Sequence, residues 1–193
     1  MDKREIFFAT ALHLIHQKGF KAMTMRDLAE SLQCDVSNLY NYVPNKQAIL
    51  KEVLLRISNR FTSHILPLAE ARLPVEKKVE SIISHYVRLT VQFPYEVALL
   101  SQDWKQLQGP ELALFLEEKN SVEKSIQSIL LDGQSIGLIR PMPAEWLVHV
   151  FLSPLRWLFE GYLKQEVPLN PFELEQYLID YITQGLYQTQ IKS

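Results

Sequence analysis

The sequence predicts an all-α protein with a short N-terminal three-helix domain and a larger helical body, about nine helices in total. Three observations predict this fold class. Apolar residues recur along almost the whole chain at the i, i+3, i+4 and i+7 spacing of amphipathic helices. Alternating strand-like runs bounded by turn dipeptides are absent, and only 6 of the 193 residues are glycine. Capping residues and prolines then divide the chain into helical segments.

The first two helices are short and have clear end signals. The first is predicted over residues 3–18, and Gly19 follows it as a C-terminal cap. Thr24 opens the second helix, because Thr24 and Asp27 have the spacing of a capping box. This second helix is expected to end near Leu32.

A short third helix and a long fourth helix follow. Asp35 is expected to cap the third helix, which ends at Tyr42 or Val43. Asn45 is expected to cap the fourth helix, and Pro67 to limit it. The predicted division into an N-terminal domain and a body therefore lies at the start of this long helix.

Prolines and glycines delimit five more helices in the body, and Pro154 is expected to kink the eighth. The predicted domains are residues 1–46 and residues 47–193, joined through the fourth helix. The five body helices are expected from Pro74 to Phe93, from Tyr95 to Leu107, from Glu111 to Ser135, after Pro143 through Phe159, and from the Asn170 cap onward.

Charge separates the head of the chain from the rest. The whole chain has a formal net charge of −2, which by itself does not indicate nucleic-acid binding. Residues 1–60 hold nine cations and six anions, a net charge of +3, whereas the remainder holds eleven cations and sixteen anions, a net charge of −5. A basic head on an acidic body is typical of a DNA-binding protein with a regulatory domain.

Other protein classes lack support in the sequence. No apolar run reaches the roughly 18 residues of a membrane span, and residues 1–5 alternate in charge, unlike a signal peptide. The one cysteine, Cys34, cannot form an internal disulfide. We therefore predict a cytoplasmic protein with no membrane partner, no cofactor, no metal site and no catalytic residues.

Residues 24–43 have the pattern of a helix-turn-helix. Leu28 faces inward from the supporting helix, and residues 33–34 form the turn. Leu39 and Val43, four residues apart, are expected to anchor the following helix to the core.

The third helix is the candidate recognition helix. Tyr40 and Tyr42 are expected to project from its DNA-facing sides. Lys46, in the first turn of the fourth helix beside free backbone N–H groups, is a candidate phosphate clamp. The N-terminal residues of the third helix are small or carry an amide and can approach base edges in the major groove: Val36, Ser37 and Asn38.

The head resembles the DNA-binding domain of the TetR family of bacterial regulators. The resemblance covers about a quarter of the chain, and residues 39–46 are its most specific part. The body matches the family only in length and helical rhythm. The residues at the family's spacings are Ala11, Gly19-Phe20, Thr24, Leu28-Ala29, Leu39-Tyr40, Tyr42-Val43 and Lys46.

The resemblance implies DNA-binding roles for eight residues. Arg26 falls where some members of the family reach a guanine. Base contacts are implied for Val36, Ser37, Asn38 and Tyr42. Phosphate contacts are implied for Thr24, Tyr40 and Lys46. The family also implies a dimer formed by the last two helices and a ligand cavity under the fourth to eighth helices.

Three features depart from the family pattern. The turn has Gln33 where glycine is usual, which predicts a non-glycine residue at positive φ. Asp35 replaces the commoner Ser or Thr cap and brings a carboxylate close to the phosphates. The basic N-terminal arm of many members is absent from residues 1–5. These departures predict weaker and more salt-sensitive DNA binding.

The body offers two further sets of candidate residues. Aromatic side chains at helical spacing are candidate walls of an effector cavity: Tyr86, Trp104, Phe115 and Trp146. The last two helices carry more apolar surface than one chain needs to bury, which predicts an isologous four-helix dimer interface. Its predicted residues are Val150, Phe151, Leu158, Phe159, Leu178, Tyr181 and Ile182.

Competing interpretations exist for three motifs. Residues 133–137 match the G-x-S-x-G elbow of hydrolases, but the preceding segment is helical, which favours a helix end over a nucleophile at Ser135. His64, His85 and His149 lie on different helices without a metal-ligand spacing, which favours packing roles. Cys34 is interpreted as a small hydrophobe, with a redox switch as its alternative.

The sequence therefore predicts a dimeric, sequence-specific DNA-binding transcriptional regulator. We expect a repressor that an unidentified small-molecule effector releases from a palindromic operator. Two alternatives stay open. One is a TetR-like protein with a degenerate head that acts through protein contacts, and the other is a hydrolase that uses Ser135.

Overall fold

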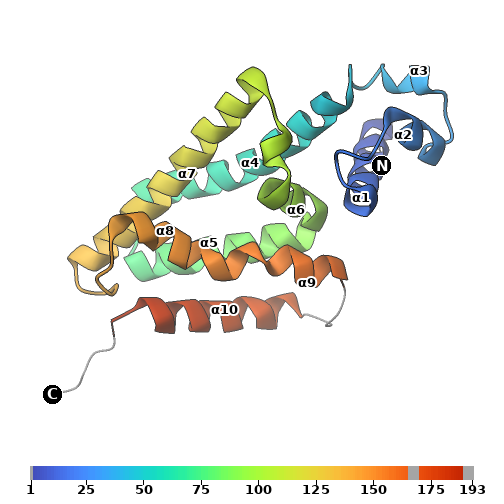
Figure 1. The fold of residues 1–193 in the computed structure, drawn as a ribbon. Helices are drawn as coiled ribbons and strands as arrows, with labels where there is room; N and C mark the ends of the chain where they lie inside the picture. The colour runs from blue at the N-terminus through green and yellow to red at the C-terminus, as the bar shows by residue number, and fades with distance from the viewer. Residues whose placement is uncertain (1, 165–169, 189–193) are drawn as a thin grey trace. The chain divides into compact units, whose positions relative to one another are not determined.

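The computed structural model describes residues 2–164 and 170–188, and within them the chain is all-α, as predicted (Figure 1). The described residues form ten α-helices and one 3-10 helix, and their one β-type pairing is an isolated bridge between Ile139 and Tyr187. The helices are α1 (Lys3–Lys18), α2 (Met25–Ser31), α3 (Val36–Leu39), α4 (Lys46–Glu70), α5 (Val75–Gln92), α6 (Pro94–Gln102), η1 (Trp104–Gln106), α7 (Gly109–Ser135), α8 (Ala144–Arg156), α9 (Leu158–Lys164) and α10 (Pro171–Leu186).

Local signals in the sequence set most helix ends. Gly19 follows α1 at φ 81°, in the left-handed region that glycine adopts without strain. Thr24 and Asp27 form the predicted capping box at the start of α2. The side chain of Asn45 accepts a hydrogen bond from the backbone N–H of Ala48, 3.0 Å away, in the first turn of α4. These caps confirm the predicted end of α1 and the predicted starts of α2 and α4.

Two predictions at the ends of α3 and α4 were wrong. The α-helix α3 ends at Leu39, and the chain continues as tight turns, in which the Tyr42 N–H donates to the Leu39 carbonyl at 2.9 Å. Pro67 does not end α4, which continues to Glu70. Proline removes only one N–H donor, and near the end of a helix little hydrogen bonding remains to be lost.

The predicted eighth helix is two helices in the structure. α8 ends at Arg156, Trp157 separates the two, and α9 starts at Leu158. Pro154 lacks the N–H that would bond to a carbonyl one turn earlier, so it weakens the helix where a single kink was expected. The break adds one helix to the predicted nine.

The chain divides into two compact units. Unit 1 combines residues 1–58 with residues 95–115, and unit 2 combines residues 59–94 with residues 116–193. The chain thus crosses between units three times: inside α4, at the start of α6 and inside α7. Compactness does not test function, so the functional division at residues 46 and 47 stays a prediction.

In unit 1, α6 and the following segment share one hydrophobic core with the helix-turn-helix. Leu99, Leu107 and Phe115 belong to the same buried cluster as α1, α2, α3 and the start of α4. Tyr95 packs against the rings of His13 and His16, with centroid distances of 6.1 and 5.1 Å. The segment 95–115 is therefore part of the scaffold of the head.

In unit 2, α5 packs against α8, α9 and α10 (Figure 1). The α7–α8 connection fastens the end of α10, because the Arg140 side chain donates to the Tyr187 carbonyl at 2.8 Å and the Arg140 N–H donates to the Leu186 carbonyl at 3.0 Å. These bonds use carbonyls that a helix end leaves unsatisfied. They fix the C-terminal end of α10 to the α7–α8 connection.

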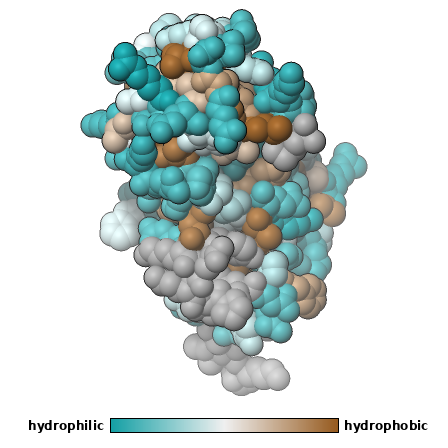
Figure 2. Space-filling model, turned by 90° about the vertical axis from the view of Figure 1, so that its right-hand side faces the viewer, coloured by the Kyte–Doolittle hydropathy of each residue, from teal (hydrophilic) through white to brown (hydrophobic). Residues whose placement is uncertain are grey.

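The described helices bury their apolar faces and turn their polar faces outward. Figure 2 shows a mostly hydrophilic face on which hydrophobic side chains form small patches. Among the described residues, no helix combines the length and the apolar character needed to cross a membrane.

Candidate DNA-binding surface

Buried apolar side chains hold the helix-turn-helix in place. Leu28 in α2 and Leu39 in α3 are fully buried, and Val43 after α3 is nearly so. All three belong to the cluster around Phe7 and Ala11 of α1. Their burial confirms the predicted anchors, and it turns the opposite faces of α2 and α3 outward.

The start of α2 is fixed by a network around Asp27. The Asp27 carboxylate accepts from the Thr24 hydroxyl at 2.7 Å, from the Thr24 N–H at 2.8 Å and from the Lys18 ammonium at 2.6 Å. The bond from Lys18, followed by those from Thr24, lowers the pKa of Asp27 to about 2. Since the one hydroxyl proton of Thr24 goes to Asp27, a phosphate contact by this hydroxyl requires a rearrangement.

The turn between α2 and α3 has the predicted strain. Gln33 has φ 52°, in the left-handed region, and it is the one non-glycine residue at positive φ among the described residues. This conformation costs an L-residue roughly 1–2 kcal/mol. The Cys34 N–H donates to the Ala29 carbonyl at 3.0 Å and closes the turn.

The recognition helix exposes part of the predicted set. Ser37 and Asn38 are exposed, and Tyr40 is 56% exposed. Val36 is half-buried. Tyr42 is also half-buried, and its ring stacks on Phe7 at a centroid distance of 5.0 Å. Ser37, Asn38 and Tyr40 can therefore reach a ligand without any change in packing.

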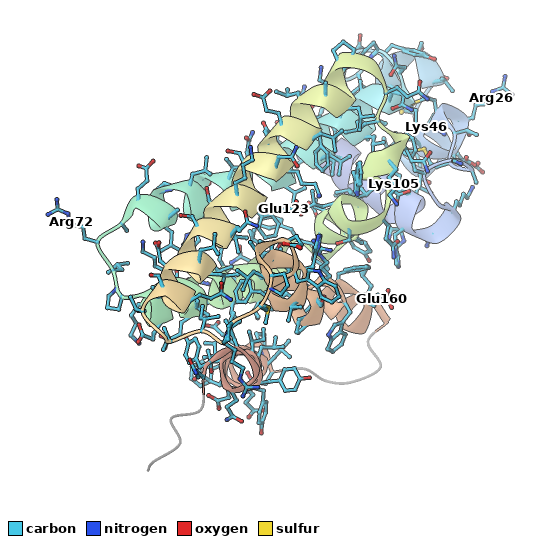
Figure 3. All side chains as sticks on the ribbon, turned by 60° about the vertical axis from the view of Figure 1, so that its left-hand side comes forward. Arg26, Lys46, Arg72, Lys105, Glu123 and Glu160 are labelled. Atoms are coloured by element: carbon cyan, nitrogen blue, oxygen red, sulfur yellow. The ribbon has the colours of Figure 1, made fainter. Side chains whose placement is uncertain are left out.

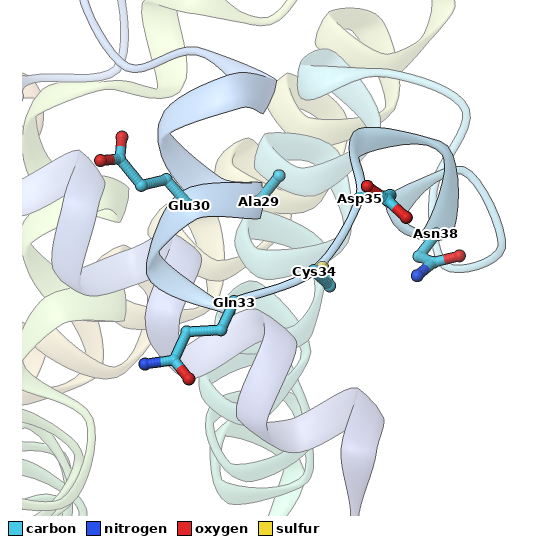
Figure 4. Close-up of a pocket in the computed structure, with 6 residues that line it drawn as sticks. All are labelled: Ala29, Glu30, Gln33, Cys34, Asp35 and Asn38. Atoms are coloured by element: carbon cyan, nitrogen blue, oxygen red, sulfur yellow. The ribbon is translucent and has the colours of Figure 1, made fainter.

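Asp35 occupies the N-cap position of α3, but its side chain makes no capping hydrogen bond, contrary to the prediction. The backbone N–H of Asn38, the group that a capping side chain would bind, donates instead to the carbonyl of Asp35 at 3.0 Å. Figure 4 shows the Asp35 carboxylate on the rim of an open groove that Glu30, Gln33 and Asn38 also line. The groove therefore carries negative charge beside the recognition helix.

Most cations of the head are engaged within unit 1. Arg4 and Arg56 pair with Glu52, Lys18 pairs with Asp27, and Lys51 pairs with Glu111. Within the described part of unit 1, Lys3, Lys21 and Arg26 are exposed and form no ion pair. Figure 3 shows Arg26 projecting into solvent. Lys21 was not among the predicted DNA-binding residues, although a lysine in the loop directly before α2 could have been recognised in the sequence as an exposed cation.

Lys46 lies differently from the expected phosphate clamp. Its ammonium donates to the carbonyls of Phe20 at 2.8 Å, Lys21 at 3.1 Å and Met23 at 2.9 Å. It also lies 4.7 Å from the centroid of the Phe20 ring. The side chain is half-buried and directed into the protein.

The four aromatic residues predicted for the effector cavity do not form one group. Phe115 is buried in the core of unit 1, and Trp104 stacks on it at a centroid distance of 5.8 Å. Tyr86 belongs to unit 2 and packs on Phe61, 4.6 Å between centroids, and burial raises the pKa of Tyr86 to about 12. Trp146 is 62% exposed on α8.

The predicted dimer residues also separate into two sets. Val150 and Tyr181 are exposed, by 46% and 72%. The other five have their side chains buried within their own chain and unavailable to a partner: Phe151, Leu158, Phe159, Leu178 and Ile182. α10 has an inner stripe and an outer stripe, and the i, i+4 pair Tyr177 and Tyr181 was the signal for the outer one.

The comparisons with known proteins agree with this geometry. Residues 7–53 match the family model described as bacterial regulatory proteins, tetR family. The N-terminal domain therefore has the sequence pattern of the TetR family. The matched segment runs from α1 into α4 and includes the whole helix-turn-helix. This head makes the protein a DNA-binding transcriptional regulator.

Named relatives resemble the chain over nearly its full length. The transcriptional repressor KstR2 of Mycolicibacterium smegmatis is 24% identical over 98% of this chain and 93% of its own. YhgD of Bacillus subtilis, an uncharacterised HTH-type regulator, is 22% identical over 96% of this chain and 97% of its own. Both relatives are named as HTH-type transcriptional regulators.

Solved structures show the same fold. KstR2 of Mycobacterium tuberculosis superposes with a TM-score of 0.88 at 14% identity, over 97% of this chain and 96% of its own. AibR, solved in complex with isovaleryl coenzyme A and operator DNA, superposes with a TM-score of 0.80 at 18% identity, over 96% and 98% of the two chains. The body of this chain therefore has the fold of these solved structures, although the sequence showed only its length and helical rhythm.

The structure shows what surrounds the three motifs that had competing interpretations. Ser135 is the last residue of the 27-residue helix α7, and its hydroxyl donates to the Asp132 carbonyl at 2.7 Å, as expected for a helix end. His64 and His85 stack at 4.0 Å between centroids, which is a packing role. Cys34 is partly buried against the head core, in keeping with a small hydrophobe.

Proposed function

We propose that the protein is a homodimeric, sequence-specific repressor that a small-molecule effector releases from a palindromic operator. The observation that carries this proposal is the intact helix-turn-helix. Its apolar anchors are buried, while Ser37 and Asn38 on the recognition helix and Tyr40 directly after it are exposed. A surface of this kind suits the major groove of DNA.

Three residues are the best candidates for direct DNA contacts. Asn38 has an amide that can pair with the edge of an adenine, and Arg26 has a guanidinium that can pair with a guanine. Tyr40 has a hydroxyl suited to a phosphate. Val36 and Tyr42, which are half-buried, would contribute apolar contact at the margin of the surface.

The exposed face of α8 and α10 supports the proposed dimer. Trp146 and Val150 are one turn apart on α8, and Tyr177 and Tyr181 are one turn apart on α10. Val150, Pro154, Tyr181 and Gly185 line a shallow depression on this face. Large apolar side chains that stay exposed in one chain mark a protein interface, and a two-fold dimer would cover both copies.

We further propose that unit 2 binds the effector, with Tyr86 as the remaining candidate of the four aromatic residues. Its ring is half-buried beside Phe61 of α4, so a ligand that displaced it would act directly on α4. Tilting α4 would change the separation of the two recognition helices and shift the population away from the DNA-bound form. The AibR complex supports an organic effector of metabolite size.

Selection of genomic DNA fragments bound by the protein tests the function. We expect an enriched inverted repeat whose half-sites lie about one helical turn, ~34–36 Å, apart. On this operator Asn38→Ala should cost ~1–3 kcal/mol of binding free energy and much less on scrambled duplex. Tyr40→Phe is the matched control, because losing one phosphate bond weakens both duplexes equally. No enriched duplex even at low salt would instead favour a degenerate head that acts through protein contacts.

A further inference from the structure

The ammonium of Lys46 uses its full hydrogen-bonding capacity inside the protein. An ammonium has three donors and no acceptor. The three donors of Lys46 match three carbonyls at 2.8, 3.1 and 2.9 Å, those of Phe20, Lys21 and Met23. The ring of Phe20 covers a further side at 4.7 Å. No donor is left for a DNA phosphate while these bonds exist.

The three carbonyls need this cation. They belong to the loop between α1 and α2, which leaves α1 through Gly19. Three carbonyl oxygens directed at one point repel one another, and a charge-assisted bond to each is stronger than a neutral one. Without the ammonium, the partly buried oxygens of Phe20 and Met23 would lose their partner.

This loop determines where α2 begins. Met23 is fully buried, and the next residue, Thr24, is the N-cap of α2. Lys46 is the first residue of α4. The bonds of Lys46 therefore join the first turn of α4 to the residues that set the start of α2, all within unit 1.

We infer that Lys46 is a positioning residue: its ammonium holds the Phe20–Met23 loop, and with it the start of α2, on the first turn of α4, and it does not contact a DNA phosphate. The inference rests on the proposed DNA binding. It makes the loop the element through which a movement of α4 reaches α2.

Two substitutions at Lys46 and one control separate positioning from phosphate contact. Lys46→Met keeps most of the aliphatic stem and removes the charge. Lys46→Arg keeps the charge, but the planar fork of a guanidinium cannot match three carbonyls around one nitrogen, although it binds phosphate well. Lys21→Met removes an exposed charge from the same loop without removing any of the three carbonyls.

The variants are titrated with a random-sequence duplex at several salt concentrations. If Lys46 positions the loop, Lys46→Met and Lys46→Arg should both weaken DNA binding about tenfold or more. The slope of binding affinity against salt concentration should stay nearly the same as in the wild type. In the DNA-free protein, amide exchange of residues 20–28 should speed up about tenfold in both variants and stay unchanged in Lys21→Met. The inference is overturned if Lys46→Arg binds DNA like the wild type while the slope of log affinity against log salt falls by ~0.9 in Lys46→Met, which is the contribution of one phosphate contact.

A measurement on the wild-type protein covers the case in which a variant does not fold. With lysine side chains labelled with ¹⁵N, the Lys46 ammonium signal should be visible and protected from exchange before DNA is added, and it should shift little when duplex is added. A signal that becomes protected only with DNA would refute the positioning role. If the wild-type protein bound no duplex, the proposed function would fail, while the DNA-free data would still report on the loop.

Discussion

Replacing Val150 with glutamate should dissociate the proposed dimer without unfolding the chain. Val150 is 46% exposed on the outer face of α8. Full burial of a valine side chain contributes about 1.5–3 kcal/mol, so covering the exposed half contributes roughly half of that in each protomer. In a two-fold interface both copies change, so the two halves add up to a loss of about 1.5–3 kcal/mol of dimerisation free energy.

The introduced carboxylates raise this cost. Each would be buried without a partner, at an effective penalty of several kcal/mol per ion. The combined loss should therefore exceed about 4 kcal/mol, which raises the dissociation constant by roughly a thousandfold or more. Phe151→Glu is a poorer test, because Phe151 is almost fully buried in its own chain and its replacement would unfold unit 2.

Light scattering and analytical sedimentation at micromolar concentration measure the outcome. The wild type should have twice the chain mass of 22.5 kDa, and Val150→Glu should have the single chain mass with an unchanged helical circular dichroism spectrum. Leu73→Glu is the matched control, because Leu73 is 49% exposed but lies between α4 and α5. A wild-type monomer, or equal dissociation of both variants, would show that the α8–α10 face is not the interface.

Three further predictions concern stability and specificity. Gly133→Ala should lower the unfolding free energy by ~1–3 kcal/mol in urea titrations, because its Cβ would lie 2.5 Å from Ile139 Cδ1, and Ile139→Val should recover part of the loss. Burial and the adjacent His64 lower the pKa of His85 to about 4, so between pH 6.5 and 4 the unfolded chain binds a proton that the folded chain does not. Stability should therefore fall as the pH falls through this window, by at most about 1.4 kcal/mol per pH unit; His85→Gln should flatten the profile and His149→Gln should not. Arg26→Ala should reduce operator binding more than binding to scrambled duplex, and equal losses in competition titrations would assign Arg26 to a phosphate.

Local patterns in the sequence were sufficient to predict the starts of α2 and α4 and the buried anchors of the head. Caps such as Thr24 and Asn45 act on backbone groups three residues away, and anchors such as Leu28 and Leu39 follow helical spacing. The strain at Gln33 was also predictable, because the turn geometry needs positive φ whichever residue occupies it.

Longer-range features were not predictable in this way. Nothing near Lys46 in the sequence indicates that three carbonyls more than twenty residues away converge on its ammonium. Likewise, apolar character alone could not tell the inner stripe of α10, with Leu178, from the outer stripe, with Tyr181. Which stripe is buried depends on how α10 packs on α5 and α8, which is a property of tertiary structure.

Unit 1 is built from two separate segments of the chain, which has a consequence for engineering biosensors from this protein. Exchanging only the first 58 residues with a relative would leave residues 95–115 behind, although they supply Leu99, Leu107 and Phe115 to the core beneath the helix-turn-helix. Such a hybrid would combine mismatched halves of one core and also lose the Lys51–Glu111 pair. A transplantable head therefore consists of two pieces of chain, and a hybrid regulator needs junctions inside α4, near residue 94 and inside α7.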